Sequence, residues 1–466
     1  MELVSKNIDQ LITSGGDERL DLLDNGLNKY YLNPNDFQGL INRGSCTCNT
    51  LNSFSKPIVN QVYSDVEGGK AYNELLAEHR KRLKDLLNYE GQDKFDIIFA
   101  PSGSDLVYLP ILFANMLHPN KKIMNFLTCP EELGSGSITA AEGNYYMAKN
   151  QFDEALPKTG SLKTGLNIEV IFFNARSSSG HILDHKETLK REIALHPNEA
   201  KIGSLVIGSK SGIADNLTVI DEVEEDVLWT IDLCQFRNSK KLVNELLDKG
   251  CSLMITGSKF YQAPPFCGAM LVPKPLVKRL QNCKLESTAA YLKTMFSAND
   301  FPDSLMNVKQ SLRSFNNLGL QLRWEAAISE MEALNELPNE VVNGTITEWN
   351  NVVMGELSKY PYFKLMPNQK ISNQTIISFR VKKDGAFLDH QALRQLYKEI
   401  LVNNHTISDQ FDRLCIGQPV EYMNKSFIRM ALGSFNLRRL LAKPAESRFD
   451  NDKRIIELIA QKIEAL

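Results

Sequence analysis

The segment that decides the fold spans residues 227–271 and reads VLWTIDLCQFRNSKKLVNELLDKGCSLMITGSKFYQAPPFCGAML. Two short apolar runs, 227–231 and 252–255, are typical of buried strands, and the stretch 240–248 between them has a helical pattern. A third strand-like run, 267–272, follows a proline-rich loop. The segment therefore predicts a strand–helix–strand unit of an α/β sheet.

Polar residues follow each of the first two predicted strands. The first strand ends in Asp232, with Gln235 three places on, and the second ends in a turn that contains Thr256, Ser258 and Lys259. Ligands of open α/β sheets bind outside the carboxyl ends of the strands. We therefore expect an acid, an amide, two hydroxyls and an amine to converge on one ligand.

These side chains suit pyridoxal phosphate, because a lysine amine can bind its aldehyde while a carboxylate pairs with its pyridinium nitrogen. The chain resembles the pyridoxal-phosphate-dependent enzymes of fold type I, most closely the class V aminotransferase and cysteine desulfurase group. The residues that carry this resemblance are Asp232, Gln235, Lys259 and the proline–glycine loop 263–268.

The resemblance implies a role for each of these side chains. Asp232 would hold the pyridine nitrogen and Gln235 the phenolic oxygen. Thr256 and Ser258 would reach the phosphate, and Lys259 would carry the imine. The alternative is that Lys259 is an ordinary surface lysine that follows a strand.

A second polar turn, Ser102-Gly103-Ser104, lies between the predicted strand 95–100 and an apolar helix. Such a turn points backbone N–H groups and hydroxyls at a phosphate, and its place before the lysine agrees with the resembled family. Serine is also a favoured helix N-cap, so a purely structural role is the alternative.

Two further loops bear on the cofactor. After the predicted strand 204–208, Ser209 or Ser211 would lie beside the phenolic oxygen according to the resemblance, although a plain turn is the alternative. The loop 129–137 has neither the histidine nor the aromatic residue that the family stacks on the ring, so the stacking residue stays open.

Arg429 lies in a strand-like run, 426–433, that is followed by Phe435-Asn436. This arrangement resembles the substrate-carboxylate arginine of the class V group. A planar guanidinium binds a carboxylate through two parallel hydrogen bonds. The alternative is an edge-strand arginine that pairs with a local acid.

Strands that end in small polar residues and are followed by helices predict a mostly parallel, doubly wound sheet. We expect a large pyridoxal-phosphate domain over 61–318 and a smaller α+β C-terminal domain over 319–466. Residues 1–60 are expected to form an arm that packs on the small domain or on a partner subunit. The resemblance also implies a homodimer with active sites near the interface, in which Ser287 or Thr288 reaches the neighbour's phosphate.

Composition narrows the function classes. A formal net charge of −3 over 466 residues gives no basic surface for nucleic acid, and the apolar runs are too short to cross a bilayer. Eight cysteines in so long a chain do not form a disulfide framework, which favours a cytoplasmic location. Cys46 and Cys48 are too close for the usual zinc spacing, so no metal site is expected.

We expect an enzyme that acts on an amino acid or amine, most simply an aminotransferase, because transamination needs only the lysine to move a proton. A lyase that cleaves a carbon–sulfur or carbon–carbon bond, similar to desulfurases or kynureninase, is the alternative, with Cys46, Cys48, Cys129 and Cys267 as candidate thiols. A non-catalytic scaffold of the same fold would be expected to lose Asp232 or Lys259, and both are present.

Overall fold

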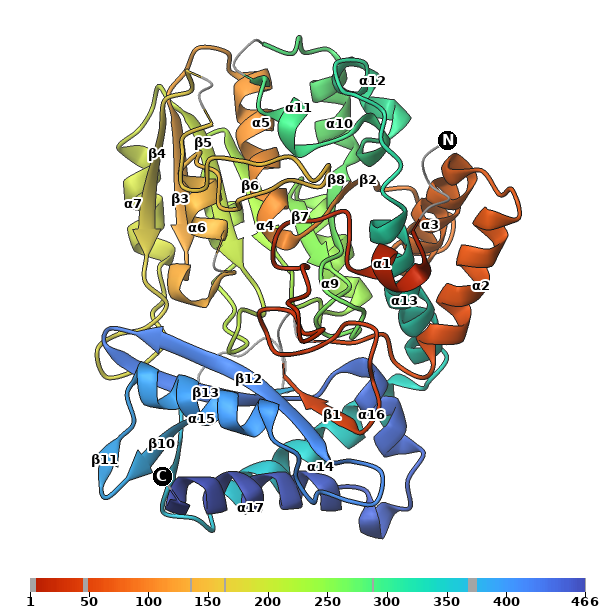
Figure 1. Cartoon of the computed structure of the whole chain (residues 1–466). Helices are drawn as coiled ribbons and strands as arrows, with labels where there is room; N and C mark the ends of the chain where they lie inside the picture. Colours follow the sequence, from red (N-terminus) through yellow and green to blue (C-terminus); the bar gives the residue numbers. More distant parts are fainter. Residues whose placement is uncertain are drawn as a thin grey trace.

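The computed structural model describes residues 6–44, 49–134, 136–162, 165–286, 289–367 and 375–465. Figure 1 shows a large sheet flanked by helices in the upper part of the molecule and a smaller sheet with its own helices below. The predicted Ser287 and Thr288, and the thiols of Cys46 and Cys48, lie outside the described residues.

The large sheet has the strand order β2-β8-β7-β6-β5-β3-β4. All of its strands run in one direction except β8, which is antiparallel to both β2 and β7. This arrangement confirms the mostly parallel α/β sheet predicted from the sequence. The strands are β2 (Phe95–Ala100), β3 (Ile123–Thr128), β4 (Ile168–Phe173), β5 (Ala200–Val206), β6 (Val227–Asp232), β7 (Ser252–Thr256) and β8 (Gly268–Pro273).

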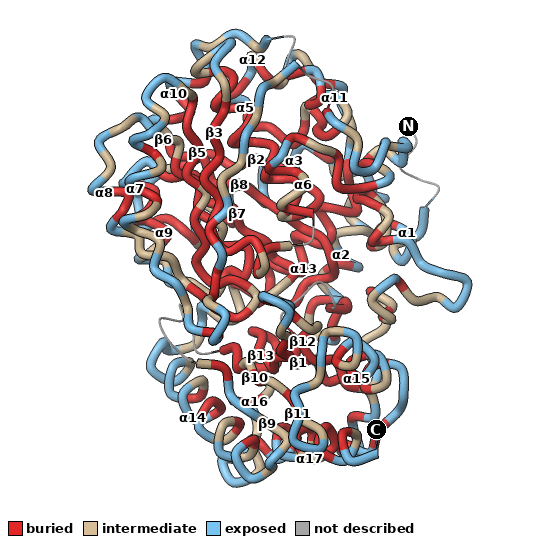
Figure 2. The backbone as a smooth tube through the Cα atoms, turned by 90° about the vertical axis from the view of Figure 1, so that its left-hand side faces the viewer, coloured by how far each residue is buried: buried red, intermediate tan, exposed pale blue. Residues whose placement is uncertain are grey.

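Helices cover both faces of this sheet, so every residue of its interior strands β7 and β8 is buried (Figure 2). Such continuous burial is typical of parallel sheets covered on two sides. One apolar core includes side chains of α3 (Tyr72–Leu87), α7 (Lys186–Ala194), α9 (Lys240–Asp248) and α13 (Leu318–Asn335). The other includes α5 (Tyr108–Leu117), α10 (Lys274–Gln281) and α11 (Leu292–Met295).

The smaller sheet has the order β1-β12-β13-β10-β11, with β9 paired to β10. Its first strand comes from the N-terminal segment: β1 pairs in parallel with β12, and Leu40 lies opposite Arg413. The N-terminal segment therefore packs on the C-terminal sheet (Figure 1). The strands are β1 (Leu40–Arg43), β9 (Phe363–Leu365), β10 (Ile376–Lys383), β11 (Ala386–Phe387), β12 (Arg413–Tyr422) and β13 (Lys425–Ala431).

The helices around the smaller sheet bury a third core against it. These are α14 (Asn339–Leu357), α15 (His390–Val402), α16 (Ser434–Leu441) and α17 (Asp450–Ala465). The remaining α-helices are α1 (Ile8–Ile12), α2 (Ser55–Glu67), α4 (Gly103–Leu106), α6 (Ser137–Ala141), α8 (Val219–Glu222) and α12 (Met306–Lys309). Short 3₁₀ turns are η2 (Pro130–Glu132), η4 (Ala298–Asp300), η5 (Asp303–Leu305) and η6 (Ala445–Ser447).

The domain boundaries drawn from the sequence stay predictions. The boundary at residue 60 falls inside α2, and the boundary at residue 318 coincides with the start of α13. Helix α13 packs against α2 and α3 on one side and α16 on another, so it links the two sheets.

In the described part of the chain, no helix has the length and hydrophobicity needed to cross a membrane. Nor does that part gather three histidine, cysteine or acidic side chains into a group able to hold a metal ion.

Candidate functional site

The ends of β6 and β7 lie side by side. The two strands are parallel neighbours, and Asp232 lies opposite Met254, two residues before the end of β7. Burial raises the pKa of the Cys234 thiol well above its usual value, the charge of Asp232 raises it further, and the charge of Lys259 lowers it. Asp232 and Lys259 therefore both lie close enough to act on one thiol.

Lys259 lines a cavity of about 740 Å³, which is within the usual size range of small-molecule sites. Gln235 and Arg429, both predicted to bind ligand, line the same cavity. The described residues that line it are Arg19, Lys29, Tyr30, Tyr31, Gly134, Lys210, Gln235, Lys259, His390, Arg394, Gln395, Tyr397, Lys398, Gln418, Pro419 and Arg429.

Asp232 is half-buried and does not belong to that lining. One of its oxygens, Oδ1, accepts a hydrogen bond from the Cys234 amide at 2.7 Å. It lines a smaller neighbouring cavity together with Leu133, Ser137 and Met254. Asp232 thus lies at the end of β6 and lines a different cavity from the one that Lys259 lines.

Arg429 is buried on β13, and its Nη1 donates to the Gln418 carbonyl at 2.8 Å. A side chain at Gly417 would place its Cβ 2.2 Å from Arg429 Cγ, so a glycine is needed where β12 passes the arginine. Burial and the nearby charge of Arg429 together lower the pKa of Arg237 to about 9. Two guanidinium groups therefore lie close together, and that of Arg429 lines the cavity.

The Ser102-Gly103-Ser104 turn contacts the ends of both strands. A Cβ at Gly103 would lie 2.9 Å from Cys234 Sγ and 3.2 Å from Thr256 Cγ2, so this contact requires glycine. Ser102 is the N-cap of α4: its Oγ accepts from the Asp105 amide at 3.4 Å, and its own amide donates to Asp105 Oδ2 at 2.8 Å. The turn therefore meets β6 and β7 and also acts as a helix cap, which is the structural role allowed for it above.

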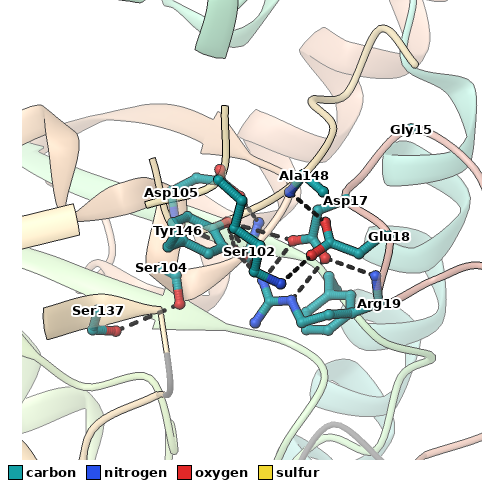
Figure 3. Close-up of polar contacts among 12 residues, drawn as sticks. Gly15, Asp17, Glu18, Arg19, Ser102, Ser104, Asp105, Ser137, Tyr146 and Ala148 are labelled. Atoms are coloured by element: carbon teal, nitrogen blue, oxygen red, sulfur yellow. Dashed lines mark hydrogen bonds and ion pairs between the residues drawn. The ribbon is translucent and has the colours of Figure 1, made fainter. Parts of the chain in front are cut away.

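Arg19 of the N-terminal segment reaches this turn (Figure 3). Its Nε and Nη2 donate to the two carboxylate oxygens of Asp17 at 2.7 and 2.6 Å, and Nη2 also lies 3.2 Å from Ser102 Oγ. The guanidinium lies over the Phe266 ring, 4.2 Å from its centroid. The sequence pattern does not predict Arg19 as a site residue, because nothing in it connects the N-terminal segment with the turn at 102–104.

Asp105 and Tyr146 complete the buried cluster around Ser102. The Tyr146 hydroxyl lies 3.0 Å from Ser102 Oγ and 3.4 Å from Arg19 Nη2. Burial and, to a smaller extent, the charge of Asp17 raise the pKa of the Asp105 carboxyl to about 7, although its hydrogen bond with Ser102 opposes the change.

Thr256 and Ser258 are buried, and their side chains bond to neighbouring protein groups. Thr256 Oγ1 donates to the Cys234 carbonyl at 2.7 Å. The Ser258 side chain hydrogen-bonds Cys267. Their predicted contacts with a phosphate stay predictions.

Ser209 and Ser211 both donate hydrogen bonds from their hydroxyls to Glu132. Arg176 Nε pairs with the same carboxylate at 3.1 Å. Lys210, between the two serines, is the residue of this loop that lines the cavity. The predicted place of either serine beside the cofactor has no support in these bonds and stays a prediction.

The two sheets have the fold predicted from the resemblance to the pyridoxal-phosphate-dependent enzymes of fold type I. This confirms the resemblance drawn from the sequence.

Solved structures similar to this chain include a NifS-like protein from Rickettsia africae, with 14% identity, 91% of this chain and 99% of that chain covered and a TM-score of 0.55. They also include the phosphoserine aminotransferase SerC from Cytophaga hutchinsonii, with 13% identity, 90% of this chain and 98% of that chain covered and a TM-score of 0.54. A third is mouse CSAD, with 16% identity, 88% of this chain and 82% of that chain covered and a TM-score of 0.53. No family model and no curated protein sequence matches the chain. At these identities the likeness establishes the fold alone.

The residues present fit pyridoxal phosphate. An amine at position 259, a half-buried acid at position 232 and a turn with hydroxyls and amides at 102–104 surround neighbouring strand ends. Gly134 lies beside this turn, since a Cβ there would lie 3.3 Å from Ser137 Oγ and 3.4 Å from Ser104 Oγ.

Proposed function

We propose that this protein is a pyridoxal-phosphate-dependent enzyme that acts on an amino acid through Lys259, most simply as an aminotransferase. The observation that carries the proposal is the position of Asp232 at the end of β6 and of Lys259 just after the end of its parallel neighbour β7, where Lys259 lines a cavity of about 740 Å³.

Five groups would hold the cofactor. Lys259 would bind its aldehyde, Asp232 its ring nitrogen and Gln235 its phenolic oxygen, while the turn 102–104 and Arg19 would hold the phosphate. Arg19 suits this role because it is buried, permanently charged and 3.2 Å from Ser102 Oγ. When bound, the cofactor supplies an electron sink for negative charge at the substrate α-carbon.

The chain's own residues would orient the substrate and move its proton. Arg429 would bind the α-carboxylate through two parallel hydrogen bonds, which fixes the substrate relative to Lys259. Lys259 would then take a proton from the α-carbon and return it at a different atom. The Asp232 carboxylate would pair with the ring nitrogen and favour its protonated form.

The alternative is a lyase that cleaves a carbon–sulfur or carbon–carbon bond, which would need a further thiol, acid or base. Burial raises the pKa of the Cys129 thiol well above its usual value and that of Cys267 to about 12, so neither is readily ionised. Neither lies in the cavity lining of the described chain. These observations argue against Cys129 and Cys267 as the thiol of a lyase, while Cys46 and Cys48 lie outside the described residues.

Two measurements on the purified full chain test the proposal. Borohydride reduction followed by peptide mass spectrometry should find the cofactor on the peptide that contains Lys259. A panel of amino acids, without added keto acid, should then convert the bound cofactor to its pyridoxamine form. Release of a cleaved product without that conversion would favour the lyase, and a protein that retains no cofactor would refute both.

We further propose a homodimer located in the cytoplasm. The described cysteines carry free thiols, which supports a reducing compartment. Light scattering of the purified protein should give twice the mass of the 52.6 kDa chain, and a monomer would contradict the proposed assembly.

A further inference from the structure

The cavity beside Lys259 is strongly cationic. Among the described residues that line it there is no aspartate or glutamate. The whole chain has a formal net charge of −3, so the positive charge is concentrated here. The cationic residues of the lining are Arg19, Lys29, Lys210, Lys259, Arg394, Lys398 and Arg429.

Three of these cations already have roles in the proposed function. Lys259 and Arg429 would bind the cofactor aldehyde and the substrate α-carboxylate, and the charge of Arg19 is partly balanced by Asp17, 2.6 Å away. The other four have no role in transamination itself. They are Lys29, Lys210, Arg394 and Lys398, which we call the mouth cations.

The mouth cations come from three parts of the chain. Arg394 and Lys398 are four residues apart on α15, so they lie on one face of that helix. Lys398 Nζ lies 5.5 Å from the ring centroid of Tyr31 in the N-terminal segment, and Lys29 is close by in that segment. Lys210 comes from the loop after β5. A cavity lined by one sign of charge raises the local concentration of oppositely charged ligands.

Positive charges that line the same cavity repel one another. Burial lowers the pKa of Lys29, and the positive charge of Arg19 lowers it further. A bound anion would relieve this repulsion, whereas a neutral or cationic side chain would not.

We infer that the amino substrate carries a phosphate group in addition to its α-carboxylate, and that the mouth cations bind this phosphate. The inference rests on the proposed function and names the substrate class of the same site. A single carboxylate can be bound by one arginine. A phosphate monoester carries about −1.5 to −2 charges at neutral pH and offers three acceptor oxygens, which suits several cations better.

Isothermal titration calorimetry on the full chain, loaded with pyridoxal phosphate, can test the inference. The probes are O-phospho-L-serine, L-serine, L-aspartate and inorganic phosphate. The test variant is Arg394→Ala/Lys398→Ala, whose positions are exposed on a helix that tolerates alanine. The matched control is Lys241→Ala/Lys278→Ala, which removes the same charge from exposed positions on α9 and α10.

O-phospho-L-serine should bind at least about tenfold more tightly than L-serine or L-aspartate, since a hydrogen bond to a charged group is worth more than a factor of ten. The test variant should lose about tenfold or more of this affinity while its affinity for L-serine is unchanged. The control should behave as the unaltered protein.

Equal affinity for the three amino acids, or equal losses for O-phospho-L-serine and L-serine in the test variant, would overturn the inference. Tight binding of L-aspartate would show that a second carboxylate suffices. That result would overturn the inference that the substrate carries a phosphate group. Failure of the proposed function has a separate measure: borohydride reduction would then fix no cofactor at Lys259. Inorganic phosphate is titrated into the same preparations, so anion binding by the mouth cations is measured whether or not cofactor is retained.

Discussion

Arg19 and Ser102 are 83 positions apart in the sequence, yet Arg19 Nη2 lies 3.2 Å from Ser102 Oγ. The arginine is held in place by the two oxygens of Asp17 and by the Phe266 ring. The N-terminal segment thereby adds a buried cation to the turn that precedes α4, at the edge of the sheet where the strand ends meet.

This relationship predicts that Arg19 contributes to binding of the cofactor phosphate. Removing the arginine alone would leave Asp17 buried without its partner, so the double variant Asp17→Asn/Arg19→Gln is the better test. Its affinity for pyridoxal phosphate should fall about tenfold or more, because one charge-assisted contact is lost. Its affinity for pyridoxal, which lacks the phosphate, should not change. The two affinities are measured from the cofactor fixed by borohydride at increasing concentration. A similar loss for both compounds would mean that Arg19 only supports the fold.

Lys259→Ala should abolish covalent fixation of the cofactor, because alanine has no amine to react with the aldehyde. Lys241→Ala is the control, since the Lys241 side chain is 77% exposed on α9. Peptide mass spectrometry after reduction measures both. Undiminished fixation in Lys259→Ala would show that another lysine holds the cofactor.

Asp232→Asn should retain covalent fixation but slow conversion of the cofactor by amino acids by about 10²-fold or more. An amide cannot stabilise a protonated ring nitrogen as a carboxylate does, and each unit of lost pKa shift corresponds to about tenfold. Asp248→Asn, at the exposed end of α9, serves as the control. The rate is followed by absorbance after mixing with the amino donor, and an unchanged rate in Asp232→Asn would remove this acid from the proposed site.

Asp105→Asn should make stability less dependent on pH. The Asp105 carboxyl has a pKa of about 7 in the folded protein, because of burial and the charge of Asp17. It titrates near 3.9 in an unfolded chain, so between these values the folded state binds more protons and stability falls as pH rises. The variant should remove this loss, which is about 2–4 kcal/mol above pH 7.

Urea unfolding of both proteins at about pH 4 and about pH 8 measures the difference. The variant's advantage should appear at the higher pH and vanish at the lower one. A constant difference would contradict the raised pKa of Asp105.

Gly257→Ala should destabilise the protein by about 1–3 kcal/mol, since an added methyl group overpacks a tight core. Its Cβ would lie 2.3 Å from Ala327 Cβ on α13, and Gly257 precedes Lys259 by two residues. Gly355→Ala is the matched control, because it lies within α14 with nothing within 4 Å of its Cβ. That change should stabilise by about 0.5–1 kcal/mol. Urea unfolding measures the stability of both variants. Equal effects would show that α13 can move away from the turn that contains Gly257 and Lys259.

The sequence by itself determined the sheet and the pairing of its two main groups. Apolar runs that alternate with helical stretches predict a mostly parallel sheet, and this sheet is confirmed. Asp232 and Lys259 could be brought together by prediction because β6, α9 and β7 form one local unit, in which each strand end follows directly from the periodicity.

Only the tertiary structure decided which distant side chains join that site. Arg19 comes from the N-terminal segment, and Arg394 and Lys398 lie on α15, a helix that packs on the other sheet. Ser209 and Ser211 were predicted to lie beside the ligand, but their hydroxyls donate hydrogen bonds to Glu132. The sequence pattern does not connect Glu132 with either serine. Periodicity reports which face of an element is buried, whereas a contact between elements depends on how separate cores pack.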